Sequence, residues 1–226
     1  MNDRSSDLTP EATGDVIKVD VWSDVQCPWC YIGKRRFERA VRDHDGAVEV
    51  TYHSFELAPD TPLDFDGSSI DYLVQRKGMS PDQVKRMLEH VTALAADEGL
   101  AFDFDSVHHI NTVRAHEVLH LAKAHGCQGA MKERLLRAYF EEGANLGRIE
   151  VLTELAVEVG LEQAEVVTSL ADRRYLPAVK ADGDQARAYG ISGVPFYVLN
   201  GQFGVSGAQP TELFAQALTQ AGDAEG

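Results

Sequence analysis

The 226-residue chain has no run of apolar residues long enough to span a membrane, and residues 1–15 lack the apolar segment of a secretory signal peptide. Basic residues are also few: 21 Lys and Arg stand against 36 Asp and Glu, which gives a formal net charge of −15. This charge argues against nucleic acid or an anionic membrane as a partner. Residues 1–15 are polar, and we expect them to form a disordered tail.

Cysteine is scarce as well, with three in the chain. Three are too few for a disulfide scaffold, and an odd number fits a reducing compartment, so we expect a cytoplasmic protein. Cys127 is isolated in the sequence, and we expect it to be an inert thiol. The other two, Cys27 and Cys30, form the motif Cys-Pro-Trp-Cys.

This motif lies between a predicted strand and a predicted helix. Residues 16–22 are rich in β-branched and aromatic side chains, as in a buried strand, and apolar residues after Cys30 recur at helical spacing. Cys27 is therefore expected at the start of the helix, with Pro28 at the first helical position, where a missing N–H costs nothing. Free N–H groups and the helix dipole at that position favour a thiolate. Such a thiolate attacks disulfides, and a second thiol one turn later resolves the mixed disulfide.

Two cysteines at this spacing can also be structural, or can form half of a zinc site. A zinc site of that kind needs a second pair of Cys or His ligands at matching spacing, and the remaining cysteine is alone. The pattern therefore favours redox chemistry.

The order of the predicted elements indicates an α/β, thioredoxin-like fold. A second strand is expected within residues 47–57, so that strand, helix and strand form a right-handed parallel crossover. Residues 68–189 are predicted to be almost entirely helical. Strands return at 194–199 and 202–205, on either side of Asn200-Gly201, a strong hairpin signal.

The predicted domain limits follow from this order. Residues 16–60 are expected to form the βαβ half of a thioredoxin-like domain and residues 186–222 its ββα half. A large all-α insertion, residues 61–185, separates the two halves. The residues expected to cap helices are Ser80, Asn111 and, before the last helix, Thr211.

Several segments together resemble the DsbA-like thiol–disulfide oxidoreductases, and within them the cytosolic FrnE-type branch. The matching segments are 23–34 (SDVQCPWCYIGK), 111–116 (NTVRAH), 137–143 (RAYFEEG), 191–196 (ISGVPF) and 206–210 (SGAQP). They extend from the first strand almost to the C-terminus. The resemblance implies a thioredoxin-like fold with a helical insertion and an enzyme that exchanges dithiols and disulfides.

The resemblance also implies roles for individual residues. Cys27 is expected to be the exposed nucleophile and Cys30 the resolving thiol, facing a cis-proline loop at Val194-Pro195. Substrate is expected to contact this loop together with Pro28 and Trp29. A proline that opens a strand has a physical reason here, because the loop would leave the Val194 main chain free to pair with an extended substrate. An ordinary trans proline at a strand start is the alternative.

The expected substrates are thiols or disulfides, on proteins or small molecules, with no resident metal or cofactor. A low-molecular-weight thiol such as glutathione or mycothiol is a candidate co-substrate. The candidate pocket residues are Asp24, Asn111, His116 and Gln209.

Two departures from the family pattern limit these expectations. Related enzymes often place a buried acid shortly before the nucleophile, and here both Asp20 and Asp24 are candidates for the proton acceptor of Cys30. Strongly oxidising relatives carry His before the second cysteine, whereas this chain has Trp29. A strongly oxidising potential is therefore not expected.

Residues 116–120 (HEVLH) match the H-E-x-x-H pattern of zinc metallopeptidases, with Glu141 or Glu142 as conceivable third ligands. The extended pattern is absent, because Lys123 and His125 do not fit its glycine and third histidine. Zinc peptidase activity remains an alternative. We expect His116 to pack beside the pocket and His120 to lie on a helix face.

Two further alternatives share the fold. Isomerases and kappa-class glutathione transferases resemble this chain, but they typically carry Ser at the position of Cys27 and lack the second cysteine. A non-catalytic peptide-binding or chaperone module would need neither thiol. The presence of both cysteines favours dithiol exchange.

Overall fold

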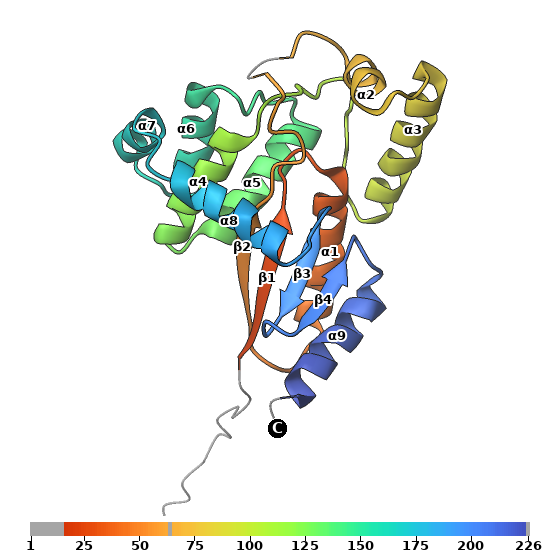
Figure 1. The fold of residues 1–226 in the computed structure, drawn as a ribbon, viewed down its shortest axis with the longest axis vertical. Helices are drawn as coiled ribbons and strands as arrows, with labels where there is room; N and C mark the ends of the chain where they lie inside the picture. Colours follow the sequence, from red (N-terminus) through yellow and green to blue (C-terminus); the bar gives the residue numbers. More distant parts are fainter. Residues whose placement is uncertain (1–15, 63–64, 225–226) are drawn as a thin grey trace, which may run out of the picture.

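A computed structural model describes residues 16–62 and 65–224, and the predicted tail therefore lies outside the described residues. The two halves of the thioredoxin-like domain meet in one four-stranded sheet of order β2-β1-β3-β4 (Figure 1). Strand β1 is parallel to β2 and antiparallel to β3, and β3 is antiparallel to β4. The elements of these halves are β1 (Ile17–Ser23), α1 (Pro28–Arg42), β2 (Val48–Ser54), β3 (Phe196–Leu199), β4 (Phe203–Ser206) and α9 (Thr211–Asp223).

The helical insertion lies between β2 and β3 in the chain and at one end of the sheet in space (Figure 1). Helices α2 and α3 stand on one side, and the remaining five form a separate group on the other. The predicted α/β fold with a helical insertion is confirmed. The insertion contains α2 (Ser69–Lys77), α3 (Pro81–Asp97), α4 (Val113–Ala124), α5 (Gln128–Glu141), α6 (Ile149–Glu158), α7 (Gln163–Ala171) and α8 (Leu176–Ala188).

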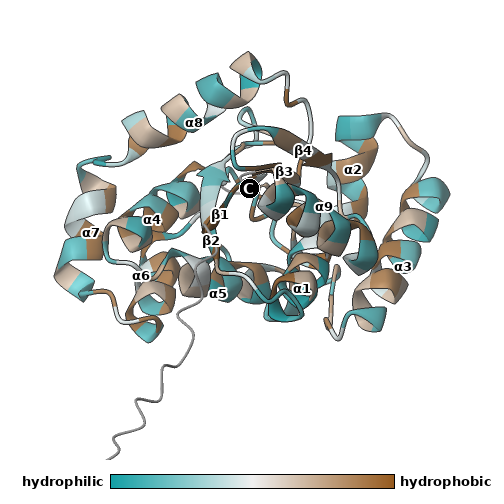
Figure 2. Cartoon of the chain, turned by 90° about the horizontal axis from the view of Figure 1, so that it is seen from below, coloured by the Kyte–Doolittle hydropathy of each residue, from teal (hydrophilic) through white to brown (hydrophobic). Residues whose placement is uncertain are grey.

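Successive side chains of β1 point to opposite faces of the sheet, and different helices pack on each face. Val19 and Val21 point into a core shared with α1 and α9, where Phe37 and Phe214 pack edge to face. Trp22 points the opposite way, into a cluster with Ala186 of α8. Figure 2 shows α8 on one side of the sheet and α1 on the other. Strand β1 therefore buries apolar side chains on both faces, although Lys18 near its start is exposed.

The predicted hairpin is present. Asn200 and Gly201 both have left-handed backbone, with φ of 48° and 68°, as a two-residue turn of this kind requires. The Asn200 carboxamide oxygen also accepts a 2.8 Å hydrogen bond from the Lys18 amide, which fixes the turn against β1.

Several predicted boundaries are wrong by a few residues. The expected domain limit at residue 185 falls inside α8, which continues to Ala188 because its last turn packs on the sheet. Pro210, not Thr211, is the N-cap of α9. Thr112 is the N-cap of α4, and Asn111 instead accepts a hydrogen bond from the Val113 amide through its side chain.

Candidate active site

The two cysteines of the motif lie at the start of α1. Cys27 is the N-cap residue and Pro28 opens the helix, as predicted. The first turn contains no acidic residue, so nothing there offsets the positive end of the helix dipole. Both cysteines are free thiols, and the Cys30 amide donates a 3.0 Å hydrogen bond to the Cys27 carbonyl. This arrangement places a dithiol at a position that favours a negative charge.

Cys27 faces the loop that precedes β3. Its Sγ atom lies 3.5 Å from the carbonyl oxygen of Val194, and the Val194–Pro195 peptide bond is cis, as predicted. Gly33 of α1 permits this close packing: a Cβ atom there would meet the Tyr197 hydroxyl at 2.9 Å and the Pro195 ring at 3.1 Å. Helix α1 can therefore approach the loop only because residue 33 has no side chain.

The expectation of an exposed nucleophile is wrong. Cys27 is 3 % exposed and Cys30 is 2 % exposed, whereas Trp29 between them is 37 % exposed. Cys27 lies at the wall of a cavity that is also lined by residues of α2 and α3 and by Val194 of the loop before β3. A substrate must enter that cavity to reach sulfur.

Electrostatics make the two thiols act as a coupled pair. A hydrogen bond to Cys30 and burial raise the pKa of Cys27 well above its usual value. Burial opposes ionisation of Cys30, but the hydrogen bond from Cys27 and the charge of Lys132 outweigh it and lower the Cys30 pKa. The pair therefore loses its first proton readily and resists losing the second, because a second negative charge would form beside the first.

Lys132 of α5 is a functional candidate that sequence reasoning missed. Its side chain is 1 % exposed, and its ammonium has no hydrogen-bond partner among the described residues. The Tyr52 ring lies 5.9 Å away. Burial lowers the Lys132 pKa, although the negative charges of Cys30 and Asp24 favour its charged form. A buried cation without a hydrogen bond is costly, and here it stabilises the thiolate.

A signal for Lys132 exists in the sequence. Gln128, Leu135 and Tyr139 belong to the buried stripe of α5, and Lys132 occurs at the same three- and four-residue spacing. A lysine on the apolar face of a predicted helix is therefore the pattern that could have found it.

The structure distinguishes the two candidate acids. Asp24 is fully buried, and its carboxylate accepts hydrogen bonds from the Leu57 amide at 2.8 Å and the Gln26 side chain at 3.1 Å. Burial opposes its ionisation, but these bonds and His116, 3.2 Å away, lower its pKa. Asp20 points to the other face of the sheet, where it contacts His53 at 2.7 Å. Asp24 is therefore the acid beside the thiols.

Not all predicted pocket residues reach the cavity. Asp24 and His116 lie behind the loop that carries Cys27 and do not line the cavity. Asn111 donates to the Pro59 carbonyl at 2.8 Å and holds the chain after β2. Gln209 donates to the Ser206 carbonyl at 2.7 Å, away from the cavity. These last two are structural, because their side chains donate to backbone carbonyls, that of Asn111 in the segment after β2 and that of Gln209 within its own loop.

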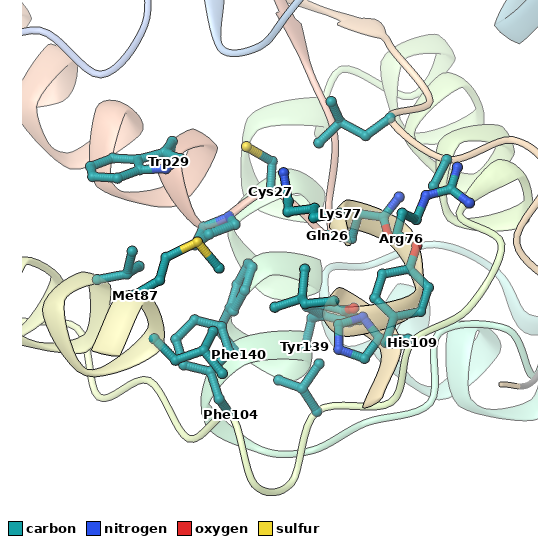
Figure 3. Close-up of a pocket in the computed structure, with 18 of the residues that line it drawn as sticks. Gln26, Cys27, Trp29, Arg76, Lys77, Met87, Phe104, His109, Tyr139 and Phe140 are labelled. Carbon is teal, nitrogen blue, oxygen red and sulfur yellow. The ribbon is translucent and has the colours of Figure 1, made fainter. Parts of the chain in front are cut away.

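The cavity beside Cys27 has a volume of about 430 Å³. Trp29 and Val194 border it on the thioredoxin side, and α2 and α3 form the opposite wall (Figure 3). Its walls are mostly apolar. Of the residues expected to contact substrate, Pro28, Trp29 and Val194 line it, and Pro195 does not. Its size is typical of small-molecule sites.

With this geometry established, comparison with known proteins is informative. Residues 18–219 match the family described as "DSBA-like thioredoxin domain". The chain belongs to this family. It is therefore a thiol–disulfide oxidoreductase by class, and the resemblance drawn from the sequence is confirmed at that level.

Individual relatives of this DsbA-like chain span nearly its whole length. It is 30 % identical to the uncharacterised protein YwbO of Bacillus subtilis, over 90 % of this chain and 96 % of that one. A crystal structure of a probable DsbA oxidoreductase from Streptomyces coelicolor has 43 % identity and a TM-score of 0.85, covering 91 % and 89 % of the two chains. The cytosolic disulfide reductase DsbM from Pseudomonas aeruginosa shares the fold at 20 % identity, with a TM-score of 0.59 and coverages of 90 % and 98 %.

The three polar side chains of the H-E-x-x-H segment in this DsbA-like chain form hydrogen bonds and ion pairs with other protein groups. His120 lies 3.0 Å from the Asp182 carboxylate and 3.1 Å from the Ser54 hydroxyl, and Glu117 forms an ion pair with Arg173 at 2.8 Å. His116 contacts Asp24 as described above. Among residues 16–62 and 65–224, no three His, Cys, Asp or Glu side chains are grouped as a metal site requires.

Cys127 is the N-cap residue of α5 and packs against the large hydrophobic core that contains most of the insertion helices. In the described ranges, no helix is both long enough and apolar enough to cross a bilayer.

Proposed function

We propose that the chain is a cytosolic dithiol–disulfide oxidoreductase in which Cys27 attacks and Cys30 resolves. One observation carries the proposal: the Cys27 sulfur is at a helix N-terminus, lines a cavity, and lies 3.5 Å from the Val194 carbonyl of a cis-proline loop. A cytosolic location is supported by the odd number of cysteines.

The proposed reaction consists of two successive thiol–disulfide exchanges. Cys27 passes its proton to the neighbouring Cys30 thiolate, and the Cys27 thiolate so formed attacks one sulfur of the substrate disulfide. A mixed disulfide forms, and the released substrate thiolate takes up the proton from Cys30. Cys30, as a thiolate, then attacks the Cys27 sulfur and releases the second thiol. Two electrons pass from the dithiol to the substrate, and the protein is left with a Cys27–Cys30 disulfide.

We further propose that a low-molecular-weight thiol, such as glutathione or mycothiol, regenerates the dithiol. The small cavity at Cys27 supports this proposal. So does a structure of DsbM with GSH on the same fold, at 20 % identity and a TM-score of 0.61.

An equilibrium redox titration tests the function, with Trp29 fluorescence and alkylation of Cys27 as the two readouts. A two-electron transition near about −270 mV indicates a reductase, and one near about −180 to −120 mV indicates an isomerase or oxidant. Cys30→Ala should accumulate a mixed disulfide that Cys27→Ala does not form, and Cys127→Ala should keep the transition. No transition, together with unreactive Cys27, would overturn the proposal.

A further inference from the structure

We propose that the cavity beside Cys27 selects small disulfides and thiols that have an apolar body, and that it excludes disulfides held in folded proteins. This inference rests on the proposed function, because it names the substrate class of the same thiol. Three observations carry it: the burial of Cys27, the volume of the cavity and the apolar side chains that line it.

The burial of Cys27 limits what can react with it. The residue is 3 % exposed and lies in the cavity wall, where its Sγ atom is 3.5 Å from the Val194 carbonyl oxygen. The sulfur of a substrate must therefore reach Cys27 inside the cavity. A disulfide of a folded protein is joined to main chain on both sides of each cysteine, so several chain segments would have to enter with it. A small disulfide carries one substituent on each sulfur and can enter end first.

The volume of the cavity sets the size of the substituent. It is about 430 Å³, which is space for about fourteen water molecules at about 30 Å³ each. A disulfide with two short alkyl arms fits within this volume. The cavity is therefore matched to small molecules rather than to a protein surface.

The cavity also gathers apolar side chains that remain accessible. Trp29 is 37 % exposed and Leu57 is 42 % exposed, and both line the cavity. Leu73 of α2 and Met87 of α3 are half-buried and line it as well (Figure 3). Accessible apolar side chains in a concave site are characteristic of a surface that an apolar ligand covers.

The charged residues of the lining do not require a charged ligand. No Asp or Glu in the described part of the chain lines the cavity, and Arg76 is already paired with Asp60. Arg76 and Lys77 are both exposed to solvent. A neutral apolar molecule can therefore fill the cavity without removing a charged group of the wall from water.

The chemistry links the apolar walls to the rate. The dithiol reduces a disulfide RSSR to two RSH and becomes the Cys27–Cys30 disulfide, so two electrons and two protons pass to the substrate. In the mixed disulfide, one arm R is bonded to the Cys27 sulfur at the cavity wall. Longer alkyl arms bury more apolar surface there, so arm length should control the rate.

Dialkyl disulfides with methyl, ethyl, propyl and butyl arms test the selection. Reduced protein is mixed with each compound, and each single-turnover rate is divided by the rate of the same compound with dithiothreitol, which removes intrinsic reactivity. We expect the normalised rate to rise about threefold for each added methylene, close to the factor that full burial gives. Insulin, whose disulfides belong to a folded protein, should react about a hundredfold more slowly than dipropyl disulfide on the same scale.

Two outcomes of this series would overturn the inference. One is a normalised rate that does not depend on arm length. The other is an insulin rate as high as that of dipropyl disulfide, which would show that protein disulfides reach Cys27.

A matched pair of methionine variants locates the selection. Met87→Gln keeps the length of a half-buried side chain and removes an apolar group from the wall, so it should lower the butyl-to-methyl rate ratio about threefold. Met79→Gln makes the same change at a half-buried methionine that does not line the cavity, and it should keep the ratio. An unchanged ratio in Met87→Gln, or an equal loss in both variants, would contradict selection by the cavity wall.

A binding measurement separates this inference from the proposed function. Trp29 lines the cavity, whereas the second tryptophan, Trp22, is 1 % exposed and packs against α8, so Trp29 emission reports on a bound molecule. In Cys27→Ser, which cannot carry out the exchange, dibutyl disulfide should bind more tightly than dimethyl disulfide. That result without any redox transition in the wild type would support the cavity and reject the oxidoreductase cycle. A normal transition with equal binding of both compounds would support the cycle and reject the apolar selection.

Discussion

The Nε2 atom of His116 lies 3.2 Å from Oδ1 of Asp24, and neither side chain is exposed to solvent. His116 belongs to the insertion and Asp24 to the loop between β1 and α1, so this contact joins the two parts directly behind the nucleophile. The insertion therefore does more than cover the thiols, because it holds the chain that presents Cys27.

Asp24→Asn should make the thiol pair more acidic. The Asp24 carboxylate is among the groups that raise the Cys27 pKa, so removing its charge should lower that pKa. The pH profile of Cys27 alkylation should shift to lower pH. Loss of one partner of a buried pair should also lower the free energy of unfolding by about 3 kcal/mol.

Asp20→Asn is the matched control for that experiment. It makes the same chemical change on the same strand–loop segment, but on the face where Asp20 contacts His53. Its alkylation profile should match that of the wild type. An equal shift in both variants would show that the effect is not specific to the acid behind Cys27.

Lys132→Met should raise the pKa of the thiol pair, in contrast to Asp24→Asn. The Lys132 charge lowers the Cys30 pKa, so the variant should be alkylated only at higher pH. Because the ammonium makes no hydrogen bond to any residue that the structure describes, its replacement should leave the free energy of unfolding unchanged or higher.

Lys34→Met provides the contrast, since this buried lysine pairs with Glu38 and Glu133 and should cost about 2 kcal/mol when removed. Urea unfolding of both variants measures the difference. A Lys132→Met protein as destabilised as Lys34→Met would contradict a purely electrostatic role for Lys132.

Gly33→Ala should disturb the site through packing alone. Its Cβ atom would lie 2.9 Å from the Tyr197 hydroxyl and 3.1 Å from Pro195, so α1 and the loop must separate. We expect a stability loss of about 1–3 kcal/mol and slower disulfide exchange at Cys27.

Gly129→Ala in α5 meets no atom within 4 Å and should lose neither stability nor activity. Unfolding midpoints and single-turnover rates check both substitutions. Normal exchange in Gly33→Ala would show that the separation of Cys27 from Val194 is unimportant.

The His53–Asp182 pair should make stability depend on pH. Burial opposes protonation of His53, but the hydrogen bonds that its ring donates to the Asp182 and Asp20 carboxylates raise its pKa above 6.5. A raised pKa stabilises the folded state below about pH 6.5, and this contribution is lost as pH rises through the folded value. The pKa of Asp182 is depressed, so its contribution is present above about pH 3.8 and lost as pH falls.

Urea unfolding between pH 3 and pH 9 should therefore show a maximum between about pH 4 and 6.5 from this pair. His53→Gln should flatten the decline above pH 6.5, whereas His90→Gln, at an exposed position of α3, should retain it. The same decline in His53→Gln would assign it to another group.

Local signals predicted the parts of the fold that depend on neighbours in the chain. The β-branched run before Cys27, Pro28 after it and the Asn200-Gly201 turn each determine the backbone within a few residues, and the structure agrees at all three. The cis bond before Pro195 followed from the family resemblance.

Which residues surround the thiols depends on contacts between residues that are distant in the sequence. Local sequence signals do not predict such contacts. His116 is 92 residues from Asp24, and Lys132 reaches the thiols from a different helix. Residue spacing in the sequence predicts neither contact, because both contacts depend on how the insertion packs on the sheet. His109 lines the cavity, and its ring is held by the Ser69 hydroxyl and by stacking on Tyr72, which are likewise distant in the chain.

The walls of the cavity come from both parts of the fold, the thioredoxin halves and the insertion. Cys27, Trp29 and Val194 belong to the thioredoxin halves, whereas α2 and α3 supply the opposite wall. Mutations in α2 and α3 can therefore change which molecules enter without altering the groups that exchange electrons. In an evolving lineage, this division lets substrate range diversify while the redox chemistry is inherited intact.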